Sequence, residues 1–257
     1  MIAASAVYFS YIVLVTLLLR PVTGRGRRGV LAAAGGGLLL TFITESTAIF
    51  WLRGVVLPPA LLLAAYWSSG LMWRGPMPRI ERALAAVDRR LGVLPLSARM
   101  PRAACEFLEL AYVGVYPLIP ITLFVHLSFT PSADADRFWT VILVTDYVCF
   151  AMLPWVQTRP PRRLEAPAPW GARLRSFNVN LLKETSIGVN TVPSGHAAEA
   201  VAAALLVSGA PWPLTAAMWG AAVAVSAGAV LGRYHFAVDA ISGWLVAVLV
   251  WTLFAGQ

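Results

Sequence analysis

Long apolar stretches recur along this chain, separated by short polar or basic segments. A helix that crosses the hydrocarbon core of a bilayer needs roughly 20 mostly apolar residues. By that criterion the pattern predicts about eight transmembrane helices, at approximately residues 3–19, 29–52, 55–73, 103–128, 138–156, 195–210, 212–232 and 237–254. We therefore expect an all-α fold, a polytopic membrane helix bundle.

One polar segment, residues 78–91, also has a helical pattern. Its apolar residues Ile80, Leu84, Val87 and Leu91 recur at helical spacing, with charged residues between them. An amphipathic helix of this kind is expected to lie on the membrane surface as an interfacial connector.

The composition agrees with a membrane protein. Of the 257 residues, 59% are hydrophobic and only 12% are charged, which is too apolar for a soluble domain of this length. The first apolar run lacks a basic start, so we expect a retained helix and no cleaved signal. Cys105 and Cys149 both fall in predicted spans and are expected to remain unpaired.

The basic residues predict the orientation. If the spans alternate in direction, eighteen of the twenty Lys and Arg residues, Arg20 among them, fall on one side, and only Arg53 and Arg137 fall on the other. The positive-inside rule places the crowded side in the cytoplasm and both termini outside, as in a bacterial cytoplasmic membrane. The net charge of +8 is thus mostly a topology signal, and no nucleic-acid partner is expected.

Three polar islands border the apolar runs: Arg159-Pro160, Pro193-Ser194-Gly195-His196, and residues 233–239. The first follows the end of one predicted span, the second begins the next, and the third follows the span after that. Helices that run in these alternating directions bring all three islands to the same face of the membrane.

The third island contains His235 and Asp239, which are four residues apart. At helical spacing the carboxylate can accept a hydrogen bond from one imidazole nitrogen and leave the other free to attack phosphorus. Such an attack forms a phosphohistidine. The alternative interpretation is an interfacial histidine beside a helix-capping aspartate.

The second island starts a predicted helix, where free N–H groups and the helix dipole favour phosphate. Gly195 permits close backbone approach, and His196 can protonate a leaving oxygen. Ser194 is either a phosphate ligand or an N-cap. The guanidinium of Arg159 can grip two phosphate oxygens, although an arginine at this place is often only a topology anchor.

The polar loop 157–193 joins two of these islands and is interpreted as a lid or headgroup-recognition loop without strong helical character. The sequence has no His-Glu-x-x-His motif, paired cysteine motif or Asp-rich metal loop. We therefore expect no metal and no cofactor.

These motifs resemble those of the type 2 phosphatidic acid phosphatase superfamily. The resemblance implies that His235 is the nucleophile, Asp239 its orienting partner and His196 the general acid, with Arg159, Ser194 and Gly195 as phosphate ligands. It also implies a six-helix phosphatase core over residues 54–257. Residues 1–53 would then supply two additional N-terminal transmembrane helices.

The chain departs from the family pattern at two positions. Met152 stands where the family usually has a lysine, and Ala229 where it usually has an arginine. Arg233 is the nearest replacement for the arginine. The candidates to replace the lysine are Arg162, Arg163 and Lys183. The Arg-Tyr-His-Phe-x-x-Asp form resembles the branch that includes inositol phosphoceramide synthase-like members.

We expect a lipid phosphatase that acts on a lipid phosphate monoester or a prenyl pyrophosphate and has membrane lipids as its other partners. The alternatives are a phosphotransferase that moves a phospho-headgroup between lipids and a catalytically inactive lipid-binding relative. Acidic residues inside predicted spans are further functional candidates, and Glu199, three residues after His196, is the one expected to touch the site. The others are Glu45, Glu106, Glu109 and Asp146.

Overall fold

The computed structural model describes residues 1–19, 24–49, 51–131, 133–164, 170 and 172–254; Arg20 lies outside them. Within these ranges the regular elements are helices, and there is no β-strand. The α-helices are α1 (Ile2–Leu19), α2 (Gly24–Ser46), α3 (Leu57–Gly70), α4 (Pro78–Arg90), α5 (Val93–Arg99), α6 (Arg102–Val113), α7 (Val115–Phe129), α8 (Ala135–Ala151), α9 (Leu174–Thr185), α10 (Gly195–Leu206), α11 (Trp212–Leu231) and α12 (Ala237–Phe254). The predicted all-α fold is confirmed.

Among the described residues, four helices are long and apolar enough to cross a membrane: α1, the Gly26–Ser46 part of α2, α11 and α12. The chain is a helical membrane protein. Helices α6 and α7 make a fifth span if they are counted together, but they are bent by 63°. The sequence pattern predicted one straight span there. The bend has a local cause, because Pro117 has no N–H for the carbonyl of Val113 and the helix breaks at Gly114.

Three other predicted spans contain helices too short to meet this criterion: α3, α8 and α10, with 14, 17 and 12 residues. A π-helical turn at Leu52–Val56 precedes α3, and α8 ends three residues before Pro154. The predicted second span, 29–52, also differs from α2, which covers 24–46. Hydropathy marks the apolar part of a segment and does not locate the breaks that proline and glycine impose. The count of eight spans stays a prediction.

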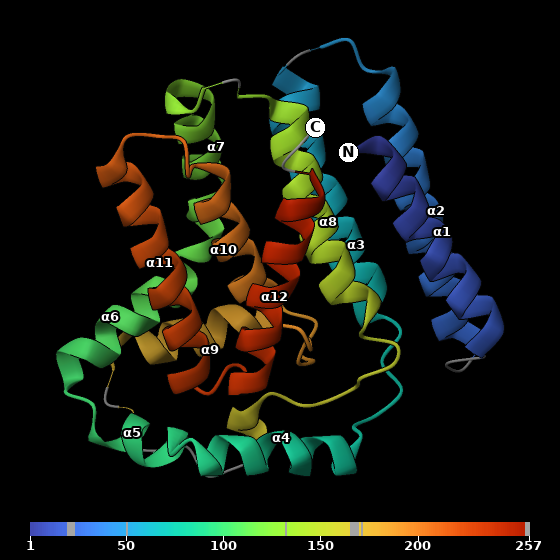
Figure 1. The fold of residues 1–257 in the computed structure, drawn as a ribbon. Coiled ribbons are helices and arrows are strands. Elements are labelled where there is room, and N and C mark those ends of the chain that lie inside the picture. Colours follow the sequence, from blue (N-terminus) through green and yellow to red (C-terminus); the bar gives the residue numbers. More distant parts are fainter. Residues whose placement is uncertain (20–23, 50, 132, 165–169, 171, 255–257) are drawn as a thin grey trace.

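Helix α10 lies at the centre of the bundle and contacts α7, α8, α11 and α12 (Figure 1). Other helices can pack closely around it because most of its residues are small. Between residues 198 and 204, every position except Glu199 and Val201 is a buried alanine. Gly243 on α12 permits the closest approach, since a Cβ at this residue would lie 2.6 Å from the carbonyl oxygen of Ser194. This packing holds the starts of α10 and α12 together.

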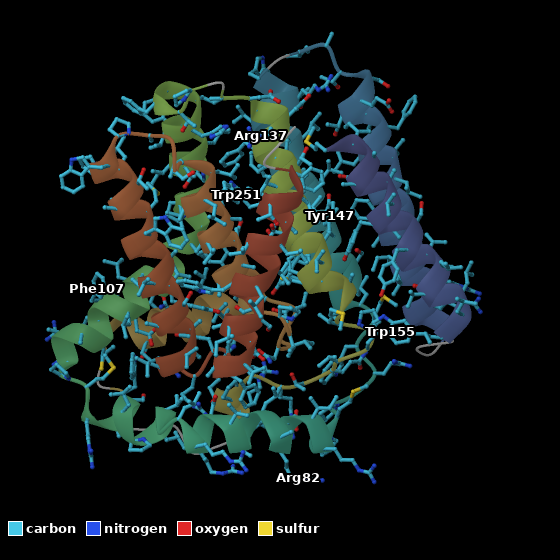
Figure 2. The ribbon with its side chains drawn as sticks, in the orientation of Figure 1. Arg82, Phe107, Arg137, Tyr147, Trp155 and Trp251 are labelled. Atoms are coloured by element: carbon cyan, nitrogen blue, oxygen red, sulfur yellow. The ribbon has the colours of Figure 1, made fainter. Side chains whose placement is uncertain are left out.

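The N-terminal helices α1 and α2 pack against each other at the edge of the bundle and contact α3, and α1 also contacts α8. Tyr147 on α8 lies on the side that faces α1 (Figure 2), and its hydroxyl is 2.9 Å from that of Ser5. The hairpin is therefore peripheral to the helices that carry the polar islands. The predicted division at residue 53 stays a prediction.

The predicted amphipathic helix is present as α4, which runs across the end of the bundle opposite to both termini (Figure 1). Its buried residues are Glu81, Leu84, Ala85 and Asp88. Leu91, expected on the apolar face, is 57% exposed. The face of α4 that meets the protein thus carries two acids, and the helix packs on α12 and is more than a surface connector.

The loop 157–193 is less irregular than predicted. It contains a 3-10 turn at Pro161–Arg163 and the helix α9, which packs against α6. The inner face of α9 includes Asn178, whose amide donates to the carbonyl oxygen of Glu109 at 2.8 Å. A polar residue at a buried position weakened the helical hydrophobic pattern, which is why the sequence did not reveal this helix.

Candidate active site

His235 lies in the turn before α12, where its backbone N–H donates to the carbonyl of Ala229 at 2.9 Å. Its Nδ1 is 3.5 Å from Oδ2 of Asp239, a fully buried carboxylate in the first turn of α12. The spacing predicted a hydrogen bond between these side chains. The structure places them as an ion pair in which Nδ1 makes no hydrogen bond to a described residue, and His235 precedes the helix. With Nδ1 directed at the carboxylate, Nε2 is the nitrogen left to face a substrate.

Asp239 is fixed by further hydrogen bonds. Its Oδ2 accepts from the backbone N–H of Phe236 and from Nδ2 of Asn190, both at 2.8 Å. Asn190 is itself held by Thr158, through an isolated β-bridge and a 3.1 Å side-chain contact. Sequence reasoning missed Asn190, since nothing in the local pattern connects it to a residue 49 positions away.

The start of α10 stands next to this pair. Ser194 is the N-cap residue, since its Oγ accepts from the N–H of Ala197 at 3.4 Å, and its own N–H donates to the carbonyl of Asp239 at 2.9 Å. The Ser194 side chain is buried in this capping role. The centroids of the His196 and His235 rings are 6.2 Å apart. Nε2 of His196 is buried and has no hydrogen-bond partner among the described residues.

Both histidines line a cavity of about 200 Å³. Gly195, Arg162 and Glu199 line it as well, as do Tyr112 and Tyr234, whose rings stack with their centroids 3.9 Å apart. The cavity therefore combines two imidazoles, one guanidinium and the N-terminus of a helix. This is a set of groups that can hold a phosphoryl group and move protons around it.

Residues 135–257 match the family model described as the PAP2 superfamily. This segment includes His196 and His235, which line one cavity, and Asp239, which pairs with His235. Residues 135–257 belong to the PAP2 superfamily. The predicted resemblance to type 2 phosphatidic acid phosphatases is thus confirmed, and enzymes of this superfamily act on phosphate esters as phosphatases or phosphotransferases. Neither the comparison with curated proteins nor that with solved structures gave a match.

The arginines near this cavity occupy different places from those that the motifs suggest. Arg159 makes a two-point ion pair with Glu81 of α4, with Nε–Oε1 and Nη2–Oε2 distances of 3.0 and 2.8 Å. Its guanidinium does not line the cavity. The hydrogen bonds from Arg159 lower the pKa of Glu81 below its usual value, which keeps this carboxylate charged.

Arg162, one of the three candidates to replace the family lysine, does line the cavity. Its guanidinium lies over the ring of Tyr234, 5.0 Å from the centroid. Burial lowers the pKa of Arg162, but an arginine remains charged in proteins. Arg162 is thus the one permanent cation among the described residues that line the cavity.

Arg233 is buried beneath the site and does not line the cavity. Its Nη1 is 2.5 Å from Oδ2 of Asp88, whose Oδ1 accepts from the N–H of Ala237 at 2.9 Å. The carbonyl of Arg233 accepts from the N–H of Arg162 at 3.0 Å. Arg233 therefore joins α4 to the start of α12 and helps to position Arg162.

The other two candidates to replace the lysine, Arg163 and Lys183, line a second hollow of about 290 Å³. Arg162 borders both hollows, and Arg175, held by a 2.9 Å ion pair to Glu109, completes the basic lining. These four basic side chains are therefore neighbours in space. Arg162 and Arg163 come from the 3-10 turn, and Arg175 and Lys183 come from α9. No cluster of three or more His, Cys, Asp or Glu residues suited to a metal ion occurs in the part of the chain that the structure describes.

The buried pair of Arg233 and Asp88 should stabilise the fold strongly. Replacing Asp88 with asparagine leaves the Arg233 guanidinium buried without its carboxylate, which typically costs about 3–5 kcal/mol. We expect a clear fall in the melting temperature of the detergent-purified protein. Arg82→Gln, on the exposed side of the same helix (Figure 2), should change stability by less than about 0.5 kcal/mol. Equal melting temperatures for the two variants would contradict the anchoring role.

Proposed function

We propose that this protein is a membrane lipid phosphatase that hydrolyses a phosphate monoester or a pyrophosphate of a lipid through a phosphohistidine, without a metal. The observation that carries the proposal is that His235, backed by Asp239, and His196 line the same cavity with their ring centroids 6.2 Å apart. A nucleophile and a general acid must both reach the phosphoryl group, and two imidazoles at this distance can contact one phosphoryl group between them.

In the first step Nε2 of His235 attacks phosphorus and the bond to the lipid oxygen breaks. Asp239 stabilises the positive charge that develops on the imidazole, and His196 gives a proton to the leaving oxygen. In the second step His196 takes a proton from water, which attacks the phosphohistidine and releases phosphate. Both histidines then return to their initial protonation states.

The negative charge on the phosphoryl oxygens is offset by Arg162 and by the positive end of the α10 helix dipole. Gly195 lines the cavity at this point, whereas Ser194 is engaged as the N-cap. Arg162 therefore supplies the guanidinium that the motif comparison assigned to Arg159. Arg159 and Arg233 hold α4 under the site through Glu81 and Asp88.

A lipid substrate is supported by the depth and lining of the cavity. Helix α10 has 12 residues and is about 18 Å long, against about 30 Å for a hydrocarbon core. The end of α10 that carries His196 is thus recessed if its other end reaches the opposite surface. Leu62, Leu63 and Phe150 provide an apolar wall for a lipid chain.

The activity is tested with purified protein in detergent and chelator. Phosphate release is measured from phosphatidic acid, phosphatidylglycerol phosphate and undecaprenyl pyrophosphate. Release from at least one of them supports a phosphatase. Transfer of a labelled headgroup to an acceptor lipid with little free phosphate would establish the phosphotransferase instead. Neither release nor transfer with any substrate would leave an inactive relative and contradict the proposal.

We further propose eight spans, with residues 1–53 as two additional helices, 54–257 as the six-helix core and the active site at the cytoplasmic face. Arg82 on α4 and Arg137 on α8 lie at opposite ends of the bundle (Figure 2), as the alternating topology requires. Arg173→Cys, on the side of α4, should stay unlabelled by an impermeant thiol reagent in intact cells, whereas Ala133→Cys should be labelled. Cys105 and Cys149 are both buried and should not react. Labelling at residue 173 would overturn this orientation.

A further inference from the structure

Two carboxyl groups line the active-site cavity that the phosphatase steps do not use. Asp146 comes from α8, and Glu199 comes from α10, one helical turn beyond His196. Asp146 is only 2% exposed, and its Oδ2 has no hydrogen-bond partner among the described residues. No described basic side chain forms an ion pair with either group.

The surroundings make this acid pair costly without a ligand. The permanent cation of the cavity, Arg162, lies over the ring of Tyr234 and pairs with neither acid. Tyr66, Tyr116 and Phe150, also in the cavity lining, present aromatic rings. Carboxyl groups buried in this way are ionised only beside a compensating positive charge, and aromatic rings favour an ammonium group. The lining thus has the chemistry of a cation site beside a phosphate site.

The two sites are close together. A Cβ placed on Gly195 would lie 3.1 Å from Oδ1 of Asp146, so this carboxyl adjoins the start of α10, where phosphate is bound in our mechanism. Glu199 is four residues further along α10, or about 6 Å at 1.5 Å per residue. A two-carbon link between a phosphate oxygen and an amine fits within this range.

We propose that Asp146 and Glu199 form a subsite for the ammonium group of the substrate, which is a long-chain amino alcohol phosphate with the amine two carbons from the phosphate ester. The ammonium lies deeper in the cavity than the phosphate, and the apolar chain extends along Leu62 and Leu63. The proposal rests on the proposed function and names its substrate class.

Two lipids with the same phosphate test this subsite. Sphingosine 1-phosphate carries an ammonium group, and ceramide 1-phosphate carries an uncharged amide at the same carbon. We expect kcat/KM to favour the amine by at least about 30-fold, as for a desolvated ion pair worth about 2 kcal/mol. The double variant Asp146→Asn, Glu199→Gln should bring this ratio to within about threefold of one. Glu45→Gln, an exposed acid on α2, should leave the ratio unchanged.

A binding measurement keeps the subsite testable even if no lipid is hydrolysed. Sphinganine should raise the melting temperature of the wild-type protein by a few degrees, N-acetylsphinganine should not, and the double variant should lose the difference. If no substrate releases phosphate but sphinganine still raises the melting temperature of the wild type alone, the proposed phosphatase activity is rejected and the ammonium subsite is supported. Equal shifts with both lipids, or an amine shift retained in the double variant, would overturn the subsite. A preference for phosphatidylglycerol phosphate that the double variant removes would indicate hydroxyl recognition and overturn it too.

Discussion

Replacing His235 with alanine is expected to lower kcat for phosphate release by at least about 10³-fold, because the variant has no atom that can form the bond to phosphorus. Asp239 keeps its hydrogen bonds from Phe236 and Asn190, and the imidazole borders a cavity, so the fold should persist and the melting temperature should change little. The measurement is steady-state phosphate release from the best substrate in the lipid panel. Activity within tenfold of the wild type would contradict the proposed nucleophile.

Two companion variants make this result specific. Asp239→Asn keeps the shape of the side chain but cannot stabilise the imidazolium, so a loss of about 10²-fold or more is expected. His126, the third histidine, lies at the other end of α10, where its ring contacts the carbonyl of Leu206 at 2.8 Å. His126→Ala should keep most of the activity of the folded protein. A similar loss in all three variants would indicate general damage to the fold.

The second large effect is expected at Arg162. Arg162→Gln should lower kcat/KM by about 10²–10³-fold, because it removes the guanidinium that offsets charge on the transferring phosphoryl group. Arg159→Gln should cost less than tenfold in kcat/KM, since Arg159 is bound to Glu81 outside the cavity. It should instead lower the melting temperature, because Glu81 loses its two-point partner.

The relative effects of these two substitutions on kcat/KM show whether the phosphate-binding arginine is Arg159, as the family motif implies, or Arg162, which lines the cavity. The family motif ends in Arg159-Pro160, and the three-residue shift to Arg162 is visible only when α4 is placed beneath the loop. If Arg159→Gln were the more damaging variant for kcat/KM, with an unchanged melting temperature, Arg159 would have to leave Glu81 and bind phosphate. That outcome would contradict the assignment of Arg162.

The sequence predicted those parts of the molecule that depend on local spacing. Asp239 lies four residues after His235, and His196 follows its N-cap by two, so local spacing fixes the position of each side chain at the start of its own helix. The alternating direction of the spans then brings both helix starts to one end of the bundle. Helices α1, α11 and α12 were predicted within two or three residues because their apolar runs are long enough to span a bilayer.

The rest depends on contacts between distant residues. Arg159 and Glu81 are 78 residues apart, and Arg233 and Asp88 are 145 apart. Glu81 and Asp88 are seven residues apart and therefore share a face of α4. This spacing indicates two acids on one side of the helix, but it does not reveal which arginines they pair with. An arginine beside a membrane span looks the same in sequence whether it binds phosphate, an acid or the membrane surface.

The central claim is that His235 carries the phosphoryl group between the two steps. The most direct test is to mix the enzyme with a ³²P-labelled substrate, quench in alkaline denaturant, and map the label by peptide mass spectrometry. We expect an acid-labile, base-stable label on the peptide that contains His235, and none in His235→Ala. Label on another residue, or turnover with no labelled protein at any quench time, would contradict the account.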